Sequence, residues 1–106
     1  MIQPANSANI NTNVTYDESD NTVILSTIVD GIADSLLYSI ETGYGMDNWD
    51  DIVFTEQGLS IDTLEYFESI GYDVNVIIDL LNDESPDKVL LKILNGRVIY
   101  DVTGRH

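Results

Sequence analysis

The sequence predicts an α+β fold, in which a single small domain combines a mainly antiparallel sheet with two short helices. Isoleucine and valine, which favour strands, occur 13 and 9 times, whereas alanine, the best helix former, occurs three times. Asn95-Gly96 lies between two apolar runs, which is the strongest short-range signal for a β-hairpin. Residues 31–42 and 60–70 place their apolar side chains at helical spacing. The length of 106 residues suits one domain.

The N-terminal part of the chain predicts an arm followed by a hairpin. Residues 1–13 are small and polar, so we expect an extended N-terminal arm in front of a single domain at 14–106. Residues 14–18 and 22–29 are predicted to pair as a hairpin, because the second run is rich in β-branched side chains and a polar turn separates the two.

Residues 31–42 have two interpretations. Asp30-Gly31 between apolar runs is a hairpin signal, which favours a strand. Strand alternation, however, would place Asp34 on the apolar side, whereas a helical wheel separates it from the apolar side chains. We therefore predict a helix that Asp30 caps and Gly43 ends, and a strand remains the alternative.

The middle of the chain predicts a loop, a strand, a helix and a second strand. Residues 45–51 are expected to form an acidic loop, and 52–55 a short strand. The next helix is predicted to be capped by Ser60 and ended by Gly71, which can adopt the left-handed conformation. From there the apolar period changes to two, which predicts a strand over 72–80.

The C-terminal part predicts a hairpin. A polar turn at 82–87 contains a proline, and the runs 88–94 and 97–103 then flank Asn95-Gly96. The predicted order of elements is therefore ββαβαβββ.

Charge is the most informative feature of the composition. The chain has 19 acidic and four basic residues, and its net charge is −15. Residues 1–87 contain no lysine or arginine, and they hold every acidic residue except Asp101. Nucleic-acid binding depends on Lys and Arg contacts to phosphates, so we expect no direct binding to nucleic acid and repulsion from anionic membranes. The expected partner is a basic protein, and the alternative is that the charge serves only solubility.

The absence of cysteine, of a signal peptide and of a long apolar run excludes several classes of protein and site. Without cysteine there is no disulfide framework, thiolate metal site or cysteine nucleophile. No signal peptide and no apolar run of about 20 residues is present, so we expect the protein in the cytoplasm of a host cell or in a virion.

Catalytic constellations are weak, so we predict that the protein is not an enzyme and has no catalytic residue. The only histidine is His106, which we expect to have little around it that could orient it. The pairs Asp50/Asp51 and Glu65/Glu68 could perform acid–base chemistry, but we interpret them as part of a solvated acidic surface.

Two acidic segments have part of the pattern that calcium binding requires. Asp17, Ser19 and Asn21 begin with the spacing of a calcium loop, but Thr22 occupies the position of the glycine that such a loop requires. The acidic loop at 45–51 could also gather oxygen atoms. A calcium-dependent adhesion module is therefore a third interpretation, and we predict no metal site and no cofactor.

The acidic surface predicts function best. A rigid array of carboxylates could occupy the phosphate-binding groove of a nucleic-acid-binding protein, with aromatic residues adding apolar contact. We therefore predict a small acidic inhibitor that mimics DNA, of the phage or anti-defence type. The alternative is a structural component of a viral particle or other assembly, with the arm at 1–13 lying on a neighbouring subunit; a homo-oligomer stays open. The predicted partner-binding residues are Asp47, Trp49, Asp50, Asp51, Glu56, Asp62, Glu65, Tyr66 and Glu68.

Overall fold

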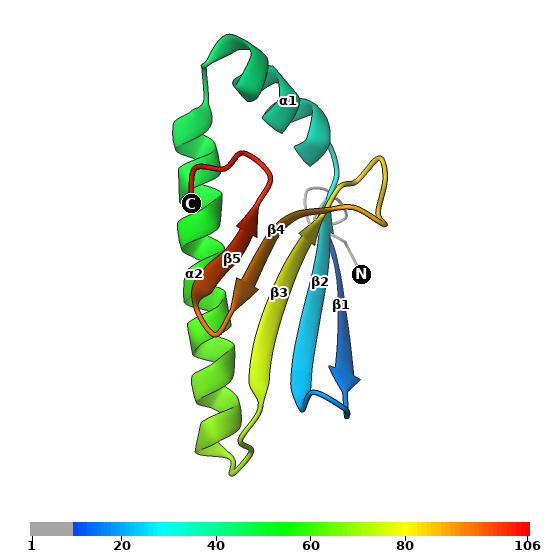
Figure 1. Ribbon diagram of the computed structural model, residues 1–106, viewed down its shortest axis with the longest axis vertical. Coiled ribbons are helices and arrows are strands. Elements are labelled where there is room, and N and C mark those ends of the chain that lie inside the picture. Colours follow the sequence, from blue (N-terminus) through cyan, green and yellow to red (C-terminus); the bar gives the residue numbers. More distant parts are fainter. Residues whose placement is uncertain (1–9) are drawn as a thin grey trace, which may run out of the picture.

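The computed structural model describes residues 10–106, which form one five-stranded sheet and two helices (Figure 1). The α+β class is confirmed. The elements follow the order ββααβββ, and their bounds are β1 Ile10–Asp17, β2 Thr22–Val29, α1 Ile32–Thr42, α2 Met46–Ser69, β3 Asn75–Leu81, β4 Val89–Leu94 and β5 Arg97–Asp101.

The strands lie in the order β1-β2-β3-β4-β5. All neighbours are antiparallel except β2 and β3, which are parallel. Parallel neighbours need a long crossover, and the chain between β2 and β3 supplies one through α1 and α2. The sheet is therefore mainly antiparallel, as predicted, with both helices inserted at a single point in the chain.

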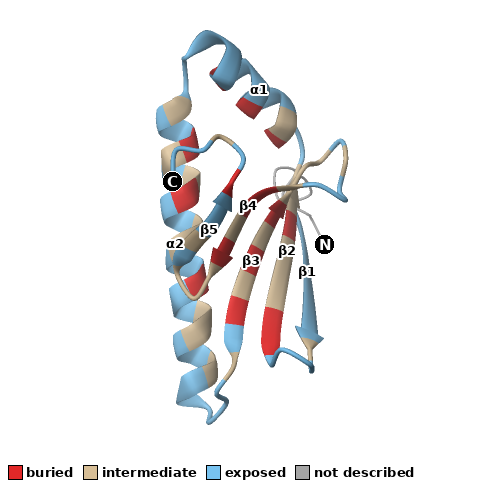
Figure 2. Ribbon diagram, in the orientation of Figure 1, coloured by how far each residue is buried: buried red, intermediate tan, exposed pale blue. Residues whose placement is uncertain are grey.

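The hydrophobic core lies on one side of the sheet, which we call the helix side. The alternate residues Val76, Ile78 and Leu80 of β3 are almost completely buried there (Figure 2). Trp49 and Val53 of α2 pack on this side and are 2% and 1% exposed. The period of two predicted for this part of the chain is thus confirmed, although β3 begins at Asn75 instead of residue 72.

The other side of the sheet, which we call the open side, has no helix over it within residues 10–106. Its residues Ile24 and Ile77 are half-buried neighbours on β2 and β3. Lys92 and Asp79 form an ion pair of 3.5 Å on the same side.

Both predicted hairpins are present. Asn95 and Gly96 have φ values of 50° and 86°, so the tight turn uses the residue types that tolerate left-handed backbone. The turn is also bound to α2: the Gly96 N–H donates to Ser60 Oγ (2.9 Å), and Gln57 Nε2 donates to the Gly96 carbonyl (3.1 Å). A Cβ at Gly96 would lie 2.5 Å from Cγ1 of Ile61. This position therefore requires glycine for two independent reasons.

Residues 32–42 are helical, which settles the ambiguity in favour of α1. Gly43 ends the helix in the left-handed conformation, as predicted, and its N–H donates to the Ser39 carbonyl at 2.8 Å. The predicted cap was wrong. Asp83, from the loop after β3, accepts from the N–H groups of Gly31 and Ala33 at 2.8 and 2.9 Å. A carboxylate distant in sequence thus takes the place of Asp30.

The second helix differs most from the sequence prediction. The predicted loop at 45–51 and strand at 52–55 were wrong, because these residues form the first turns of α2. The helix is 24 residues long, so it is not short, and Ser60 is a fully buried mid-helix residue instead of a cap. β-Branched residues favour strands only weakly, and packing of this segment on the sheet overrides that preference.

The end of α2 agrees with the prediction. Gly71 has φ of 92°, and the Tyr72 N–H donates to the Phe67 carbonyl at 2.9 Å. The rings of Phe67 and Tyr72 meet edge to face, with centroids 6.4 Å apart. The chain therefore reverses here as the glycine signal predicted.

The predicted arm is described only in part. Residues 10–13 of the predicted arm form the first half of β1 and pair with β2. Residues 1–9 lie outside the described part of the chain.

Candidate acidic interface

The candidate site is the solvent-exposed side of α2, a helix of about 36 Å at 1.5 Å per residue. Its opposite side is fixed to the sheet by Trp49, Val53 and Ser60, which recur at helical spacing and are all buried. Contacts with β3, β4 and β5 hold the helix along its length. The outer side chains are therefore displayed from a rigid support.

A single stripe of the helix carries most of the exposed acidic residues. At 100° per residue, Asp47, Asp51, Asp62 and Glu65 fall within an arc of about 60°. All four are exposed and lie on the side opposite Val53. We call the four carboxylates the acidic stripe.

The acidic stripe consists of two pairs. Asp47 and Asp51 are one helical turn apart, as are Asp62 and Glu65, so the Cβ atoms of each pair lie about 5–6 Å apart and their carboxylates project side by side. About 16 Å of helix separates the pairs, from 11 residues at 1.5 Å each. The negative charge is therefore concentrated at two points.

An exposed aromatic residue occupies the space between the pairs. Phe54 lies about 20° from Asp47 and Glu65 on the helical wheel and is 77% exposed, more than any other large hydrophobic side chain described. Gly58 follows one turn later, and a Cβ there would meet no atom within 4 Å. Phe54 therefore projects beside a flat, unobstructed part of the helix.

Two further predicted residues are exposed near the C-terminal pair. Tyr66 is 59% exposed, and Glu68 is also exposed. Both flank the acidic stripe instead of lying on it, at about 100° and 60° from Glu65. Six of the nine predicted residues thus share the exposed part of α2.

Trp49 does not belong to this surface, so its place among the predicted partner-binding residues was wrong. It is 2% exposed, and its Nε1–H donates to both carboxylate oxygens of Asp101, at 3.2 and 3.3 Å. The partner lies 52 residues away in sequence, so local pattern could not place this side chain.

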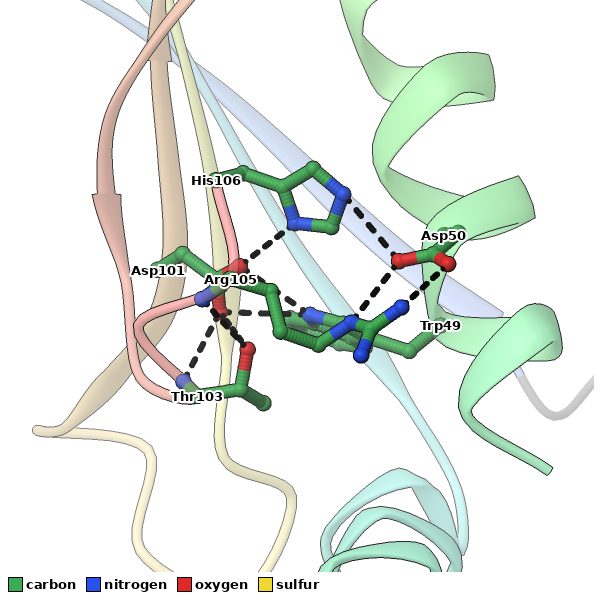
Figure 3. Close-up of polar contacts among 6 residues, drawn as sticks. All are labelled: Trp49, Asp50, Asp101, Thr103, Arg105 and His106. Carbon is green, nitrogen blue, oxygen red and sulfur yellow. Dashed lines mark hydrogen bonds and ion pairs between the residues drawn. The ribbon is translucent and has the colours of Figure 1, made fainter. Parts of the chain in front are cut away.

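Asp50 is also occupied by a contact within the chain (Figure 3). Arg105 donates to both its oxygens, from Nε at 3.0 Å and Nη2 at 2.6 Å. These hydrogen bonds, with the charge of Arg105 and of His106, hold the pKa of Asp50 below its ordinary value despite partial desolvation. Arg105 therefore neutralises Asp50, which is not available to a partner as an unpaired charge.

His106 bridges the two acidic residues, contrary to the expectation that little would orient it. Its Nδ1 lies 2.7 Å from Asp101 Oδ2 and its Nε2 lies 3.1 Å from Asp50 Oδ1, as Figure 3 shows. Thr103 donates to Asp101 through its N–H and its hydroxyl, at 2.8 and 2.7 Å. Both ring nitrogens of His106 and the carboxylates of Asp50 and Asp101 thus have partners within the chain. These contacts join the C-terminal segment to α2.

Burial opposes the ionisation of Asp101, but hydrogen bonds outweigh it. The contacts with His106, Thr103 and Trp49 favour the carboxylate and lower the pKa of Asp101. The charged form is therefore the one that the surrounding groups stabilise.

Glu56 has the opposite environment. It is half-buried, and its Oε2 is enclosed with no hydrogen-bond partner among residues 10–106. Desolvation raises the pKa of Glu56. Its predicted place on the exposed interface was therefore wrong, because it lies against the sheet side of the helix.

Phe54 is not among the predicted interface residues, because the sequence pattern predicts a strand at residues 52–55. The signal that could have placed it is the helical spacing of Trp49, Val53 and Ser60, continued by Leu64 and Phe67. A residue one position after Val53 on such a helix points away from the buried side.

The calcium interpretation finds no support in the arrangement of these residues. Within the described range, no three His, Cys, Asp or Glu side chains are grouped so that they could hold a metal ion. The expected acidic loop is helical, and the Asp17 carboxylate accepts from the N–H and hydroxyl of Ser19, at 3.0 and 2.7 Å, as part of a turn.

Comparison with known proteins gives no match: no family model, no curated protein and no solved structure is significantly similar to this chain. In residues 10–106, no helix is both long enough and apolar enough to cross a membrane.

Proposed function

We propose that this chain is a small, non-enzymatic acidic protein that binds a basic nucleic-acid-binding protein and occludes its phosphate-binding surface. The observation that supports the proposal is the acidic stripe, a set of four exposed carboxylates on one side of a rigid helix. No Lys or Arg lies within α2, so no positive side chain of the helix interrupts the stripe.

The spacing of the charges limits what the partner must look like. Neighbouring phosphates on one DNA strand are about 3.4 Å apart along the axis, so each carboxylate pair spans about two of them. The midpoints of the two pairs are about 22 Å apart along the helix, so the partner should offer two anion sites at about that separation. An apolar depression between the two sites would receive Phe54, since aromatic residues often dominate binding energy.

The proposed mechanism is competition for the same cationic surface. Association with a basic partner would be fast and sensitive to salt, because opposite charges steer the encounter. α2 is already folded against the sheet, so binding of the acidic stripe does not have to order the helix and costs no conformational entropy there.

The test compares two triple variants with the same change in net charge. The interface variant carries Asp51→Asn, Asp62→Asn and Glu65→Gln, and the control carries Asp20→Asn, Asp87→Asn and Glu18→Gln. All six parent residues are exposed. The last three lie outside α2, in or beside turns of the sheet.

The immobilised protein is exposed to lysate proteins, and the bound fraction is then challenged with a 20-bp duplex DNA and with NaCl. We expect elution by both, loss of binding by the interface variant, and retention by the control. Equal losses of binding in the two variants would show that binding depends on net charge and not on the acidic stripe. Bound protein that the duplex DNA does not elute would contradict occlusion of a phosphate-binding surface.

A single substitution separates the apolar contribution. Because Phe54 is mostly exposed, Phe54→Ala should change the stability by less than about 0.5 kcal/mol. If Phe54 fills a depression on the partner, affinity should fall at least about tenfold. Unchanged affinity would remove the apolar contact from the proposal and leave only the charges.

A further inference from the structure

We propose that β1 is a dimerisation edge, at which two copies of this chain pair their sheets antiparallel into one continuous sheet. Within residues 10–106, nothing pairs with the outer edge of β1, which ends the strand order. β1 is eight residues long, and its pairing with β2 runs from Ile10 to Asp17 without a register shift. A long, regular edge with unpaired backbone groups is a template for another strand.

The opposite edge of the sheet is protected, whereas β1 is not. β5 has five residues, begins with the charged Arg97, contacts α2, and shifts register against β4 between Lys92 and Ile93. Short strands, charges and bulges are the devices by which proteins block edge-to-edge association. β1 has none of them before Asp17, and Asn11 to Tyr16 are all exposed.

The charge distribution identifies a second copy as the occupant. Residues 1–16 are the longest run without a charged side chain, and 21–29, which contains most of β2, is the next longest. In a chain with a net charge of −15, the β1 edge is therefore the surface at which two copies approach with the least repulsion.

The side chains of β1 suit pairing about a two-fold axis perpendicular to the sheet. Such an axis keeps the helix sides of both copies together, so residues from the same side face each other across the new pair. Val14 and Tyr16 lie on the helix side and are 61% and 53% exposed. In the second copy they would meet Val14 and Thr12, which buries apolar surface that the monomer leaves in water.

The acidic helices stay far apart in this arrangement. α2 contacts β3, β4 and β5, so the nearest strand that it touches lies two positions from β1. Five strand spacings, or about 24 Å, then separate the corresponding strands of the two copies. This exceeds the Debye length of about 8 Å at physiological ionic strength, so repulsion between the two acidic stripes is largely screened.

Sedimentation velocity of the full chain tests the proposal across a range of concentrations. We expect a monomer–dimer equilibrium in which the dimer fraction rises with concentration and also between about 0.02 and 0.3 M NaCl, because salt screens repulsion between like charges. This salt dependence is opposite to that of the proposed basic partner, whose binding salt should weaken. Failure of either proposal is therefore visible without affecting the other.

Two matched variants locate the interface. Thr15→Glu places a charge on the exposed open side of β1, and Thr55→Glu adds the same charge on the exposed side of α2. Thr15→Glu should weaken dimerisation at least about tenfold, and Thr55→Glu should change it less than about twofold. Circular dichroism checks that each variant is folded. Asn11→Glu, on the same side of β1, is a second variant of the proposed edge and should weaken dimerisation in the same way as Thr15→Glu.

A protein that is monomeric at every concentration and salt would overturn the proposal. So would equal weakening by Thr15→Glu and Thr55→Glu, because dimerisation would then depend on total charge instead of the β1 edge.

Discussion

Gly96 is the position at which one added methyl group should test how α2 packs on the sheet. Its φ of 86° costs alanine about 1–2 kcal/mol, the left-handed penalty for a residue with a Cβ. The added Cβ would also lie 2.5 Å from Ile61 Cγ1, where ordinary contact is about 3.5–4 Å. Overpacking of this kind costs about 1–3 kcal/mol, so Gly96→Ala should destabilise the fold by about 2–5 kcal/mol in total.

Gly71→Ala is the matched control for backbone strain. Gly71 has nearly the same φ, 92°, but a Cβ there would meet nothing within 4 Å. Its substitution should cost only the left-handed penalty of about 1–2 kcal/mol. The difference between the two variants therefore measures the contact with α2.

Urea denaturation followed by the fluorescence of the single tryptophan, Trp49, measures both changes. In an Ile61→Ala background, Gly96→Ala should lose its packing cost and retain its strain, so the double-mutant cycle should give a coupling of about 1 kcal/mol or more. Equal costs for Gly96→Ala and Gly71→Ala, with a coupling below about 0.5 kcal/mol, would refute the close approach of turn and helix.

Four other perturbations test the helix, its buried groups and its charge. Gly58→Ala should raise stability by about 0.5–1 kcal/mol in denaturant melts, because glycine in a helix interior is unfavourable and a Cβ meets open space; a loss of stability would show a contact that the structure lacks. Glu56→Gln should stabilise the fold at pH 7, by up to about 1 kcal/mol, because the raised pKa of Glu56 makes its charged form unfavourable; the gain should shrink as acid protonates Glu56, and a gain that is independent of pH would contradict the cause. Asp101→Asn should lower the free energy of unfolding by about 1–3 kcal/mol at pH 7 through its lost hydrogen bonds. Because the folded pKa of Asp101 is lowered, the stability that its carboxylate contributes is complete above about pH 4 and is lost as pH falls through that lowered value. The free energy of unfolding of the variant should therefore depend less on pH in acid than that of the unmodified protein. For the unmodified protein, a few hundred millimolar NaCl should raise the melting temperature by screening repulsion in a chain of net charge −15, and an unchanged melting temperature would show that repulsion is negligible.

Local signals predicted the parts of the fold that depend on local physics. Asn95-Gly96 forms the predicted turn because few residue pairs tolerate left-handed backbone at both positions. Gly43 and Gly71 end the two helices for the same reason. The alternation of apolar residues in β3 can be recognised in the sequence, because the strand buries one of its two sides whichever element covers that side.

The errors concern residues whose roles depend on distant partners. The first half of α2 contains strand-favouring residues, and it is helical because Trp49 and Val53 pack on the sheet. Asp83 caps α1 from a position about 50 residues away, which no local capping rule can detect. Asp50 is predicted as a solvated acid, but it pairs with Arg105, which lies 55 residues later in the chain.

The sequence by itself determined the α+β class, the turns, the apolar side of β3 and the excess of negative charge, since each is a property of composition or of neighbouring residues. Only the tertiary structure decided which acidic residues form a surface. It joined 46–69 into one helix, buried Trp49, paired Asp50 with Arg105 and left Phe54 exposed between two carboxylate pairs. The physical reason is that burial and ion pairing are settled by contacts between residues far apart in the chain, and those contacts form only when the sheet and α2 pack together.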